Sequence, residues 1–340
     1  MIKILVDAFG GDNSPEEIIA GSISALNEND TFHLVLVGKQ HIIEEQLKSY
    51  TYDKERVSIL NADDVITCEE EPTVAIRRKP NSSISVAFKE LKENPEAGAF
   101  VSAGSTGAVL VGATLKLGRI KGVNRPALCP SLPTFVDGKQ VLLLDSGANA
   151  DCKPINLVQF AIMGSAYAES MGVKDPKVAL LSNGTEDEKG NALNHQVFPV
   201  LKSLKCINFV GNCEARDILS GDYDVVVADG FSGNVALKSM EGAIGVVLKT
   251  LKGGIYGSIK GKIGGLFLKK TFSKLKDKLD YNNKGGALFL GVNKPVIKAH
   301  GSSKRLAIKN TVLQAVQYAK FNISEKITEK LSAEEIQIGE

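Results

Sequence analysis

The chain has 340 residues, of which 43% are hydrophobic and 24% are charged, and its formal net charge at pH 7 is +2. This composition is typical of a soluble globular protein that is long enough to bury a sizeable core. The small net charge, with no arginine-rich or aromatic-interleaved basic tract, argues against a nucleic-acid partner. The five cysteines are scattered and never in C-x-x-C spacing, which favours a reducing cytoplasm over a disulfide framework or a zinc site.

Short apolar runs alternate along the chain with longer amphipathic stretches, which is the pattern of repeated β–α units. We expect strands at Ile2–Val6, Phe32–Val37, Val57–Leu60, Ala99–Ser102, Val141–Asp145, Val178–Ser182, Ile207–Val210 and Val225–Ala228. We expect helices at Pro15–Leu26, His41–Ser49, Ser83–Glu93, Thr106–Leu117, Ile155–Met171, Ala192–Ser203 and Gly233–Leu251. The pattern predicts a three-layer α/β/α fold with one mostly parallel sheet, forming a single catalytic unit over residues 1–340.

The segment from Ala97 to Leu115 carries no charge and approaches the length of a membrane span. Its many glycine, serine and threonine residues are better explained by a buried strand, a turn of small residues and a helix. A helix start has unpaired backbone N–H groups and a partial positive charge, and small side chains let an oxyanion approach them. The turn 102–107 therefore predicts an anion site.

Four other strand ends carry similar small and polar turns, at residues 7–12, 145–149, 183–187 and 229–234. In open α/β sheets the ligand lies beyond the carboxyl ends of the strands, so we expect all five turns to line one cleft. The alternative is that each tight turn simply needs glycine. The candidate substrate-binding residues in these turns are Asp12, Gly104, Ser105, Thr106, Asn149, Asn183 and Glu186.

The glycine spacing excludes a dinucleotide fingerprint, because no two of the 33 glycines are two positions apart. A Walker loop is excluded as well, since each Gly-Lys pair lacks the following Ser or Thr and the upstream glycine. No cluster of His, Cys and carboxylate residues has ligand spacing. The expected site therefore works without nucleotide, redox cofactor or tightly held metal.

Residues 253–280 read as a basic amphipathic arm within the catalytic unit, and from Lys252 to Asp280 there are eight lysines against two aspartates. On a helical wheel, one apolar stripe comprises Ile255, Ile259, Ile263, Leu266 and Phe267, and a second comprises Leu268, Phe272, Leu275 and Leu279. We expect two short helices that break near 264–265 and contact an anionic membrane or an acidic carrier protein. The alternative is a helical hairpin packed into a dimer interface.

The order of motifs is similar to that of a known family. The motifs are 7–12 (DAFGGD), 102–108 (SAGSTGA), 118–122 (GRIKG), 125–127 (RPA), 145–149 (DSGAN), 184–187 (GTED), 189–191 (KGN), 211–212 (GN), 229–235 (DGFSGNV) and 297–301 (IKAHG). From about Ile2 to the helix after Gly301, the chain resembles PlsX, the bacterial phosphate acyltransferase family of phospholipid synthesis. It departs from the usual pattern at Phe9 (usually Met), Asn13 (His), Ser105 (Asn), Ser182 (Asn) and Ser232 (Thr).

The resemblance implies conversion of acyl-[acyl carrier protein] and inorganic phosphate to acyl phosphate and free carrier protein. It implies a fold similar to isocitrate and isopropylmalate dehydrogenases and to phosphotransacetylases, and a homodimer. It also implies a cytoplasmic enzyme with peripheral contact to anionic membrane, where a membrane glycerol-3-phosphate acyltransferase would take up the product.

Attack of phosphate on a thioester needs a partly dehydrated anion, a positioned carbonyl and donors for the developing oxyanion. Phosphate is itself the nucleophile and a thiolate leaves readily, so Cys152 and Cys213 are expected to be packing residues. We expect Ser105 and Thr106 to bind phosphate, with a cation from Lys189. Asn234 would donate to the carbonyl, and His300 is the third catalytic candidate.

Each catalytic candidate has a structural alternative. Lys189 could be a solvated loop residue paired with Glu186 or Asp187, Asn234 a helix N-cap, and His300 a structural histidine. Two other functions also compete. A phosphotransacetylase acting on acetyl-CoA would not need the basic apolar arm, and a non-catalytic scaffold at the membrane would not need the polar turns.

Overall fold

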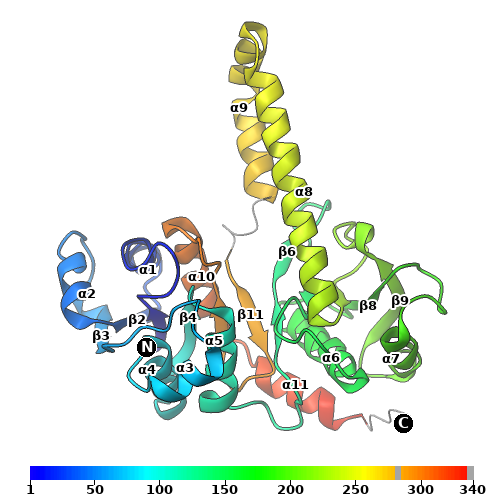
Figure 1. Cartoon of the computed structure of the whole chain (residues 1–340), viewed down its shortest axis with the longest axis horizontal. Helices are drawn as coiled ribbons and strands as arrows, with labels where there is room; N and C mark the ends of the chain where they lie inside the picture. Colours follow the sequence, from blue (N-terminus) through cyan, green and yellow to red (C-terminus); the bar gives the residue numbers. More distant parts are fainter. Residues whose placement is uncertain (280–284, 335–340) are drawn as a thin grey trace.

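The computed structural model describes residues 1–279 and 285–334. It confirms the α/β class, but the strands form two sheets side by side instead of one (Figure 1). The first sheet has seven strands in the order β3-β2-β1-β4-β12-β11-β5, and β11 is antiparallel to both of its neighbours. Its strands are β1 (Ile2–Asp7), β2 (Phe32–Gly38), β3 (Val57–Asn61), β4 (Ala97–Ser102), β5 (Ala127–Cys129), β11 (Ala287–Leu290) and β12 (Val296–Lys298).

The second sheet has five strands in the order β6-β7-β10-β8-β9, all parallel except the edge strand β6. They are β6 (Ser131–Pro133), β7 (Gln140–Leu144), β8 (Lys177–Ser182), β9 (Asn208–Glu214) and β10 (Val225–Val227). All the predicted strands are present, with ends shifted by a few residues. The short strands β5, β6, β11 and β12 were not predicted.

The predicted helices are also present. The helices are α1 (Glu16–Glu28), α2 (Gln40–Leu47), α3 (Pro72–Arg78), α4 (Ser83–Glu93), α5 (Thr106–Gly112), α6 (Pro154–Ser170), α7 (Ala192–Ser203), α8 (Gly230–Tyr256), α9 (Ile259–Leu279), α10 (Arg305–Tyr318) and α11 (Ile323–Ser332). Short helical turns are the 3-10 turns η1 (Lys54–Arg56) and η3 (Ala215–Asp217) and the π-helix η2 (Ala113–Leu117), which continues α5. Helix α10 is the helix expected after Gly301, for which no bounds were given, whereas α3 and α11 were not predicted.

The strands are apolar on both faces because helices cover both faces of the sheets. In β1, Ile4 and Val6 pack into the core that contains α1 and α10, whereas Leu5 points to the opposite core with α4. The first of these cores also contains Leu144 and Leu180 of the second sheet. One continuous apolar core therefore joins the two sheets.

Two helices from distant parts of the chain close this shared core. Helix α11, the last described helix, packs against α6 of the second half (Figure 1). Nearby, the buried Tyr167 of α6 donates a hydrogen bond to the hydroxyl of Tyr318 at the end of α10. These contacts fix the position of one sheet relative to the other.

Helices α8 and α9 lie against each other and project from the body as a hairpin (Figure 1). The expected break at 264–265 is wrong: the chain turns at 257–258 and α9 runs through both glycines. The hairpin is thus an extension of α8 and not a pair of short helices starting at residue 253. Among the described residues, no helix combines the length and the apolar character needed to span the bilayer.

The carboxylate of Asp145, directly after β7, organises the turn that follows. One oxygen accepts hydrogen bonds from the backbone N–H groups of Leu128, Gly147 and Ala148 at 2.9, 3.2 and 3.0 Å. The other accepts from the backbone and side-chain nitrogens of Asn149 at 2.7 and 2.9 Å. Because Leu128 belongs to β5, this buried side chain also joins the first sheet to the second.

We predict that Asp145→Asn lowers the free energy of unfolding by about 3 kcal/mol, because either orientation of the amide turns an NH₂ group toward backbone donors. Denaturant-induced unfolding measures the change. The control is Asp151→Asn in the same loop, which is exposed and should change stability by less than about 0.5 kcal/mol. Equal unfolding midpoints for the two variants would contradict the prediction.

Candidate active site

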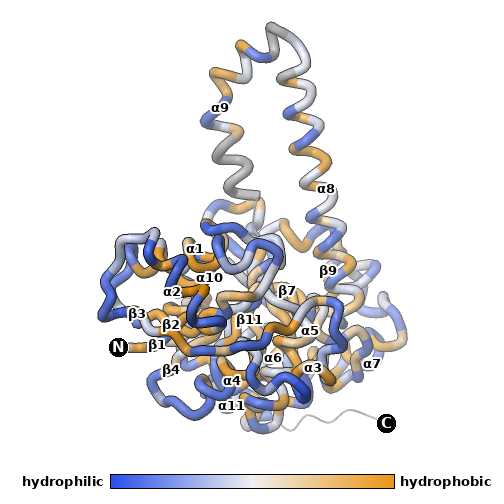
Figure 2. Tube along the Cα trace, turned by 60° about the vertical axis from the view of Figure 1, so that its left-hand side comes forward, coloured by the Kyte–Doolittle hydropathy of each residue, from blue (hydrophilic) through white to orange (hydrophobic). Residues whose placement is uncertain are grey.

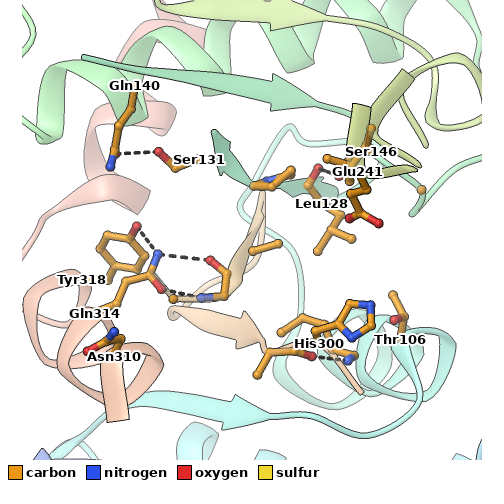
Figure 3. A pocket seen from close by; sticks show the side chains of 18 of the residues that line it. Thr106, Leu128, Ser131, Gln140, Ser146, Glu241, His300, Asn310, Gln314 and Tyr318 are labelled. Atoms are coloured by element: carbon orange, nitrogen blue, oxygen red, sulfur yellow. Dashed lines mark hydrogen bonds between the residues drawn. The ribbon is translucent and has the colours of Figure 1, made fainter. Parts of the chain in front are cut away.

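A cavity of about 800 Å³ lies between the two sheets, a size common for small-molecule sites (Figure 3). Thr106 of α5, Asn234 of α8 and His300, after β12, all line it. Figure 3 shows Thr106 and His300 on one side, with Gln314 and Tyr318 of α10 on the other. Three of the predicted residues, far apart in sequence, therefore share one cavity.

The turns after β1, β4 and β12 pack so closely that the two glycines of the first turn, Gly10 and Gly11, leave no room for a side chain. A Cβ on Gly10 would lie 2.6 Å from the backbone nitrogen of Gly104, and one on Gly11 would lie 2.8 Å from the carbonyl of Gly301. The backbone N–H of Asp12 donates to that same carbonyl at 2.9 Å. Predicted residues Asp12 and Gly104 thus lie behind the cavity wall formed by Gly301 and do not themselves line it.

Asn13, a position where the resemblance has His, reinforces this contact. Its amide donates to the carbonyls of Ser302 and Ser303 at 3.1 and 3.3 Å. The turn before α1 is thereby bound to the turn that carries His300.

Lys298, the last residue of β12, is a cavity residue that the sequence analysis did not single out. Its side chain is only 8% exposed. Burial lowers the pKa of Lys298 to about 8, against the opposing influence of Cys68, Asp7 and Asp12. The signal was present in the sequence: a lysine interrupts the apolar run 296–299 just before a His-Gly turn.

The ring of His300 is held by Ser302. The backbone N–H of Ser302 lies 3.3 Å from Nδ1, and the Ser302 hydroxyl lies 2.9 Å from the same atom. Since a backbone N–H can only donate, Nδ1 is the acceptor and the neutral ring carries its proton on Nε2. Burial, followed by the charge of Lys238, lowers the pKa of His300. The ring is therefore a neutral hydrogen-bond donor near neutral pH.

The structure contradicts the alternative that Asn234 is a helix N-cap. Helix α8 begins at Gly230, and Asp229 is the cap, because its carboxylate accepts from the backbone N–H of Ser232 at 2.8 Å. Asn234 lies within the helix, beside Gly147 of the turn after β7. Its exposed side chain is free to face a ligand.

Helix α8 adds charge one and two turns further along. Lys238 and Glu241 both line the cavity and form an ion pair at 2.8 Å. Together with Lys298, the described lining holds two lysines and one carboxylate. An anion is the ligand that this balance favours.

Two predicted substrate-binding residues have structural contacts of their own. The hydroxyl of Ser105 caps α5 by accepting from the backbone N–H of Ala108 at 3.4 Å. The amide of Asn149 donates to the carbonyl of Pro126 at 2.7 Å and to Asp145. Neither residue lines the cavity, although Ser146 and Gly147 of the same turn as Asn149 do. Their contact with substrate stays a prediction.

No residue of the turn 183–187 lines this cavity, and the turn instead shares a second groove with part of the turn 229–234, so the expectation of one cleft for all five turns is wrong. Asn183 lines a second groove of about 740 Å³, together with Ser182, Phe231 and Val235. This groove follows the other side of α8.

Glu186 and Lys189 are exposed and lie beside Gly184 in that turn. Asp187 is paired instead with Lys202 at 2.6 Å. Their predicted roles, including the catalytic role of Lys189, stay predictions.

The cysteines have the character of packing residues. Cys213 is fully buried, and burial raises the pKa of its thiol to about 12. Burial also raises the pKa of Cys152, to about 11. Because both pKa values lie well above 7, both thiols are protonated at neutral pH and are poor nucleophiles.

Comparison with known proteins places this chain in a family. The family model described as fatty acid synthesis protein matches residues 2–326. A phosphate acyltransferase from Clostridium novyi is 49% identical over 96% of this chain and 97% of its own length, and one from Bacillus cereus is 45% identical over 99% and 100%. A phosphotransacetylase structure from Staphylococcus aureus covers 94% of both chains, with a TM-score of 0.59 and 17% identity.

The fold is that of phosphotransacetylases, and the protein is an acyl-transferring enzyme. The chain belongs to the fatty acid synthesis protein family, which confirms the resemblance to bacterial phosphate acyltransferases.

We predict that the C2–H resonance of His300 titrates below the ordinary histidine value of about 6.5 in an NMR pH titration. Lys238→Met should raise the pKa of His300, because it removes a nearby positive charge and leaves Glu241 without its partner. Lys309→Met, which breaks a remote ion pair with Glu28, is the control. Equal shifts in both variants would contradict the assigned cause.

Proposed function

We propose that the protein transfers the acyl group of acyl-[acyl carrier protein] to inorganic phosphate, giving acyl phosphate and free carrier protein. The observation that carries the proposal is the cavity between the sheets, whose charge balance favours an anion and which brings Thr106, Asn234 and His300 together. Family membership and the name of the relatives support the same reaction. The step would belong to phospholipid synthesis.

The cavity offers separate places for the two substrates. Thr106 and His300 lie at one end of the cavity, and Gln314 and Tyr318 of α10 lie at the other (Figure 3). The lining from α10 and the residues after it combines polar side chains with the apolar Leu313 and Phe321. We place phosphate at the end with Thr106 and His300, and the acyl chain toward α10, where Leu313 and Phe321 offer apolar contacts. This arrangement would hold the thioester carbonyl between the anion and α8.

In the proposed reaction, a phosphate oxygen attacks the thioester carbonyl, and the tetrahedral oxyanion then collapses with loss of the carrier thiolate. The C–O bond forms, the C–S bond breaks, and the proton of hydrogen phosphate ends on the thiol. Asn234 and the Nε2–H of His300 are the donors we assign to the oxyanion, where each such donor contributes about 10²-fold or more to the rate. No covalent enzyme intermediate is needed.

We further propose that the α8–α9 hairpin attaches the enzyme to an anionic membrane, where a membrane acyltransferase could take up the product. Hydrophobic and hydrophilic residues alternate along it (Figure 2), and several of the hydrophobic ones are exposed. On α9, Ile263, Leu266 and Phe267 are 59%, 77% and 84% exposed, whereas Ile255 on α8 is half-buried. The side chain of Ile259 and all of residues 280–284 lie outside the described part of the structure.

The same hairpin could instead form the interface of a homodimer or contact the carrier protein. An apolar surface with lysines favours the membrane, because burial of apolar side chains and attraction of lysines to anionic lipid both strengthen binding there.

We predict that free thiol appears from palmitoyl-carrier protein only when inorganic phosphate is present, because phosphate is the nucleophile. Thiol release is followed with and without phosphate, using palmitoyl-carrier protein, palmitoyl-CoA and acetyl-CoA in parallel. Preference for acetyl-CoA would point to a phosphotransacetylase. Release that ignores phosphate, or no release from any thioester, would refute the proposed function.

We predict that the double variant Leu266→Asp, Phe267→Asp lowers binding to vesicles containing anionic lipid by about tenfold or more, because two exposed apolar anchors are lost. Flotation with anionic and with neutral vesicles measures binding. Val74→Asp, a change at a 45% exposed valine on α3, is the matched control. If the double variant floats normally but sediments as a smaller species, the hairpin serves dimerisation instead.

A further inference from the structure

The two lysines that line the cavity differ in burial and in whether they have an ion-pair partner. Lys238 is half exposed and forms an ion pair with Glu241 at 2.8 Å. Lys298 is buried and has no ion-pair partner among the described residues. A buried ammonium without a counter-ion lowers the stability of the fold, so its presence indicates a role other than stabilising the structure.

The surroundings of Lys298 hold its ammonium in place without neutralising it. Its Nζ donates to the carbonyl of Ala103 at 3.2 Å and to the carbonyl of Ala299. An ammonium has three N–H donors, so one donor and the whole positive charge are left over. The strand pairing of Lys298 with Ser102 sets this position, because it joins the ends of β12 and β4.

The nearest buried carboxylate already has other partners. Asp7 accepts from the hydroxyl of Ser102 at 2.7 Å and from the backbone N–H of Phe9 at 3.2 Å. Burial raises the pKa of Asp7, which weakens it as a counter-ion. Asp12 lies nearby but is exposed, with its carboxylate beside Gly301. The charge of Lys298 therefore remains available to a ligand in the cavity.

We infer that Lys298 binds the phosphate nucleophile directly, through its third N–H and its positive charge, at the end of the cavity that Thr106, His300 and Gly301 line. The inference rests on the proposed function and locates one substrate within it. Phosphate supplies the negative charge that no described side chain provides to Lys298. The lysine in turn holds the phosphate out of water, where a phosphate oxygen can attack the thioester carbonyl. The cation predicted for this task, Lys189, does not line the cavity.

Lys294 provides a matched control within the same segment. Its Nζ also donates to two backbone carbonyls, those of Asn94 and Ala97, at 3.0 and 2.9 Å. Burial lowers its pKa as well. It precedes β12 and does not line the cavity, so it shares the chemistry of Lys298 but not the location.

The test compares Lys298→Met with Lys294→Met in phosphate-dependent thiol release from palmitoyl-carrier protein. For Lys298→Met we expect the KM for inorganic phosphate to rise about tenfold or more while the KM for the thioester changes less than about twofold. Lys298→Arg should restore part of the phosphate affinity, and Lys294→Met should keep both constants. Unchanged phosphate KM in Lys298→Met, with an active wild type, would overturn the inference but leave the proposed function standing.

A second measurement needs no variant. Amine acylation followed by peptide mass spectrometry compares labelling of Lys298 and Lys294 in the wild-type protein, with and without inorganic phosphate. We expect phosphate to protect Lys298 and not Lys294. Equal labelling of Lys298 in both conditions would overturn the inference even if Lys298→Met does not fold.

Discussion

The fixed separation of the two sheets is the constraint on which the site depends. Neither sheet contains a complete site: Thr106 and His300 follow strands of the first, while Asn234 lies on a helix that follows the second. The cavity has a defined shape only because one apolar core continues from sheet to sheet through α6 and α11. Dense packing of this kind resists small displacements, so the three side chains that line the cavity keep fixed positions relative to one another.

Two buried charged side chains illustrate the difference between a residue that stabilises the fold and a residue that is available to a ligand. Asp145 is enclosed by five N–H donors, and nothing in its surroundings calls for a ligand. Lys298 has only two carbonyl partners and no counter-ion among the described residues. A charge satisfied by the protein stabilises a turn, whereas a charge left unsatisfied at a cavity wall is arranged for a substrate.

The same contrast applies to the amides. Asn149 uses its side chain to brace the turn after β7, while Asn234 presents its side chain to the cavity. Both residues are asparagines a few positions after a strand, so the sequence alone does not distinguish them. What differs is the set of hydrogen-bond acceptors around each side chain, which only the folded chain defines.

Much of the fold could be predicted from the sequence because buried parallel strands leave long apolar runs. The strand at Phe32–Gly38 is buried along nearly its whole length and was readily identified. The three-residue β10 was still predicted because it is an unbroken run of valines, whereas β12 ends on a lysine and carries too little apolar pattern to distinguish from a loop. The division into two sheets was also hidden, since strands of both sheets have the same apolar character.

The site was predictable where a turn of small residues follows a strand, as at Thr106. It was not predictable where the deciding fact is distance in space. The turn 183–187 has the same polar composition as the others, yet it opens on a second groove. Lys298 was overlooked because a lysine in a short strand looks like a surface residue until its burial is known.

The beginning of α8 misled the sequence analysis for a reason that bears on function. Two glycines near its start suggested a turn, but they allow close packing against the turn after β7 and Asp229 caps the helix from its first residue. The helix therefore enters the cavity with Asn234 already in regular geometry. The whole helix is 27 residues long, about 40 Å at 1.5 Å per residue, and its far end forms part of the projecting hairpin.

One rigid element thus carries Asn234, the oxyanion donor that we propose, near one end and the exposed hairpin at the other. A continuous helix has no hinge along its axis, so a membrane bound to the hairpin, as we propose, would also fix the direction in which the cavity faces. The acyl phosphate formed in the proposed reaction combines a long apolar chain with a charged head, and it would leave the cavity most favourably where an apolar phase is near. Attachment at the far end of α8 would place the cavity within helix length of that phase, which gives the hairpin a reason to be continuous with the helix that carries Asn234.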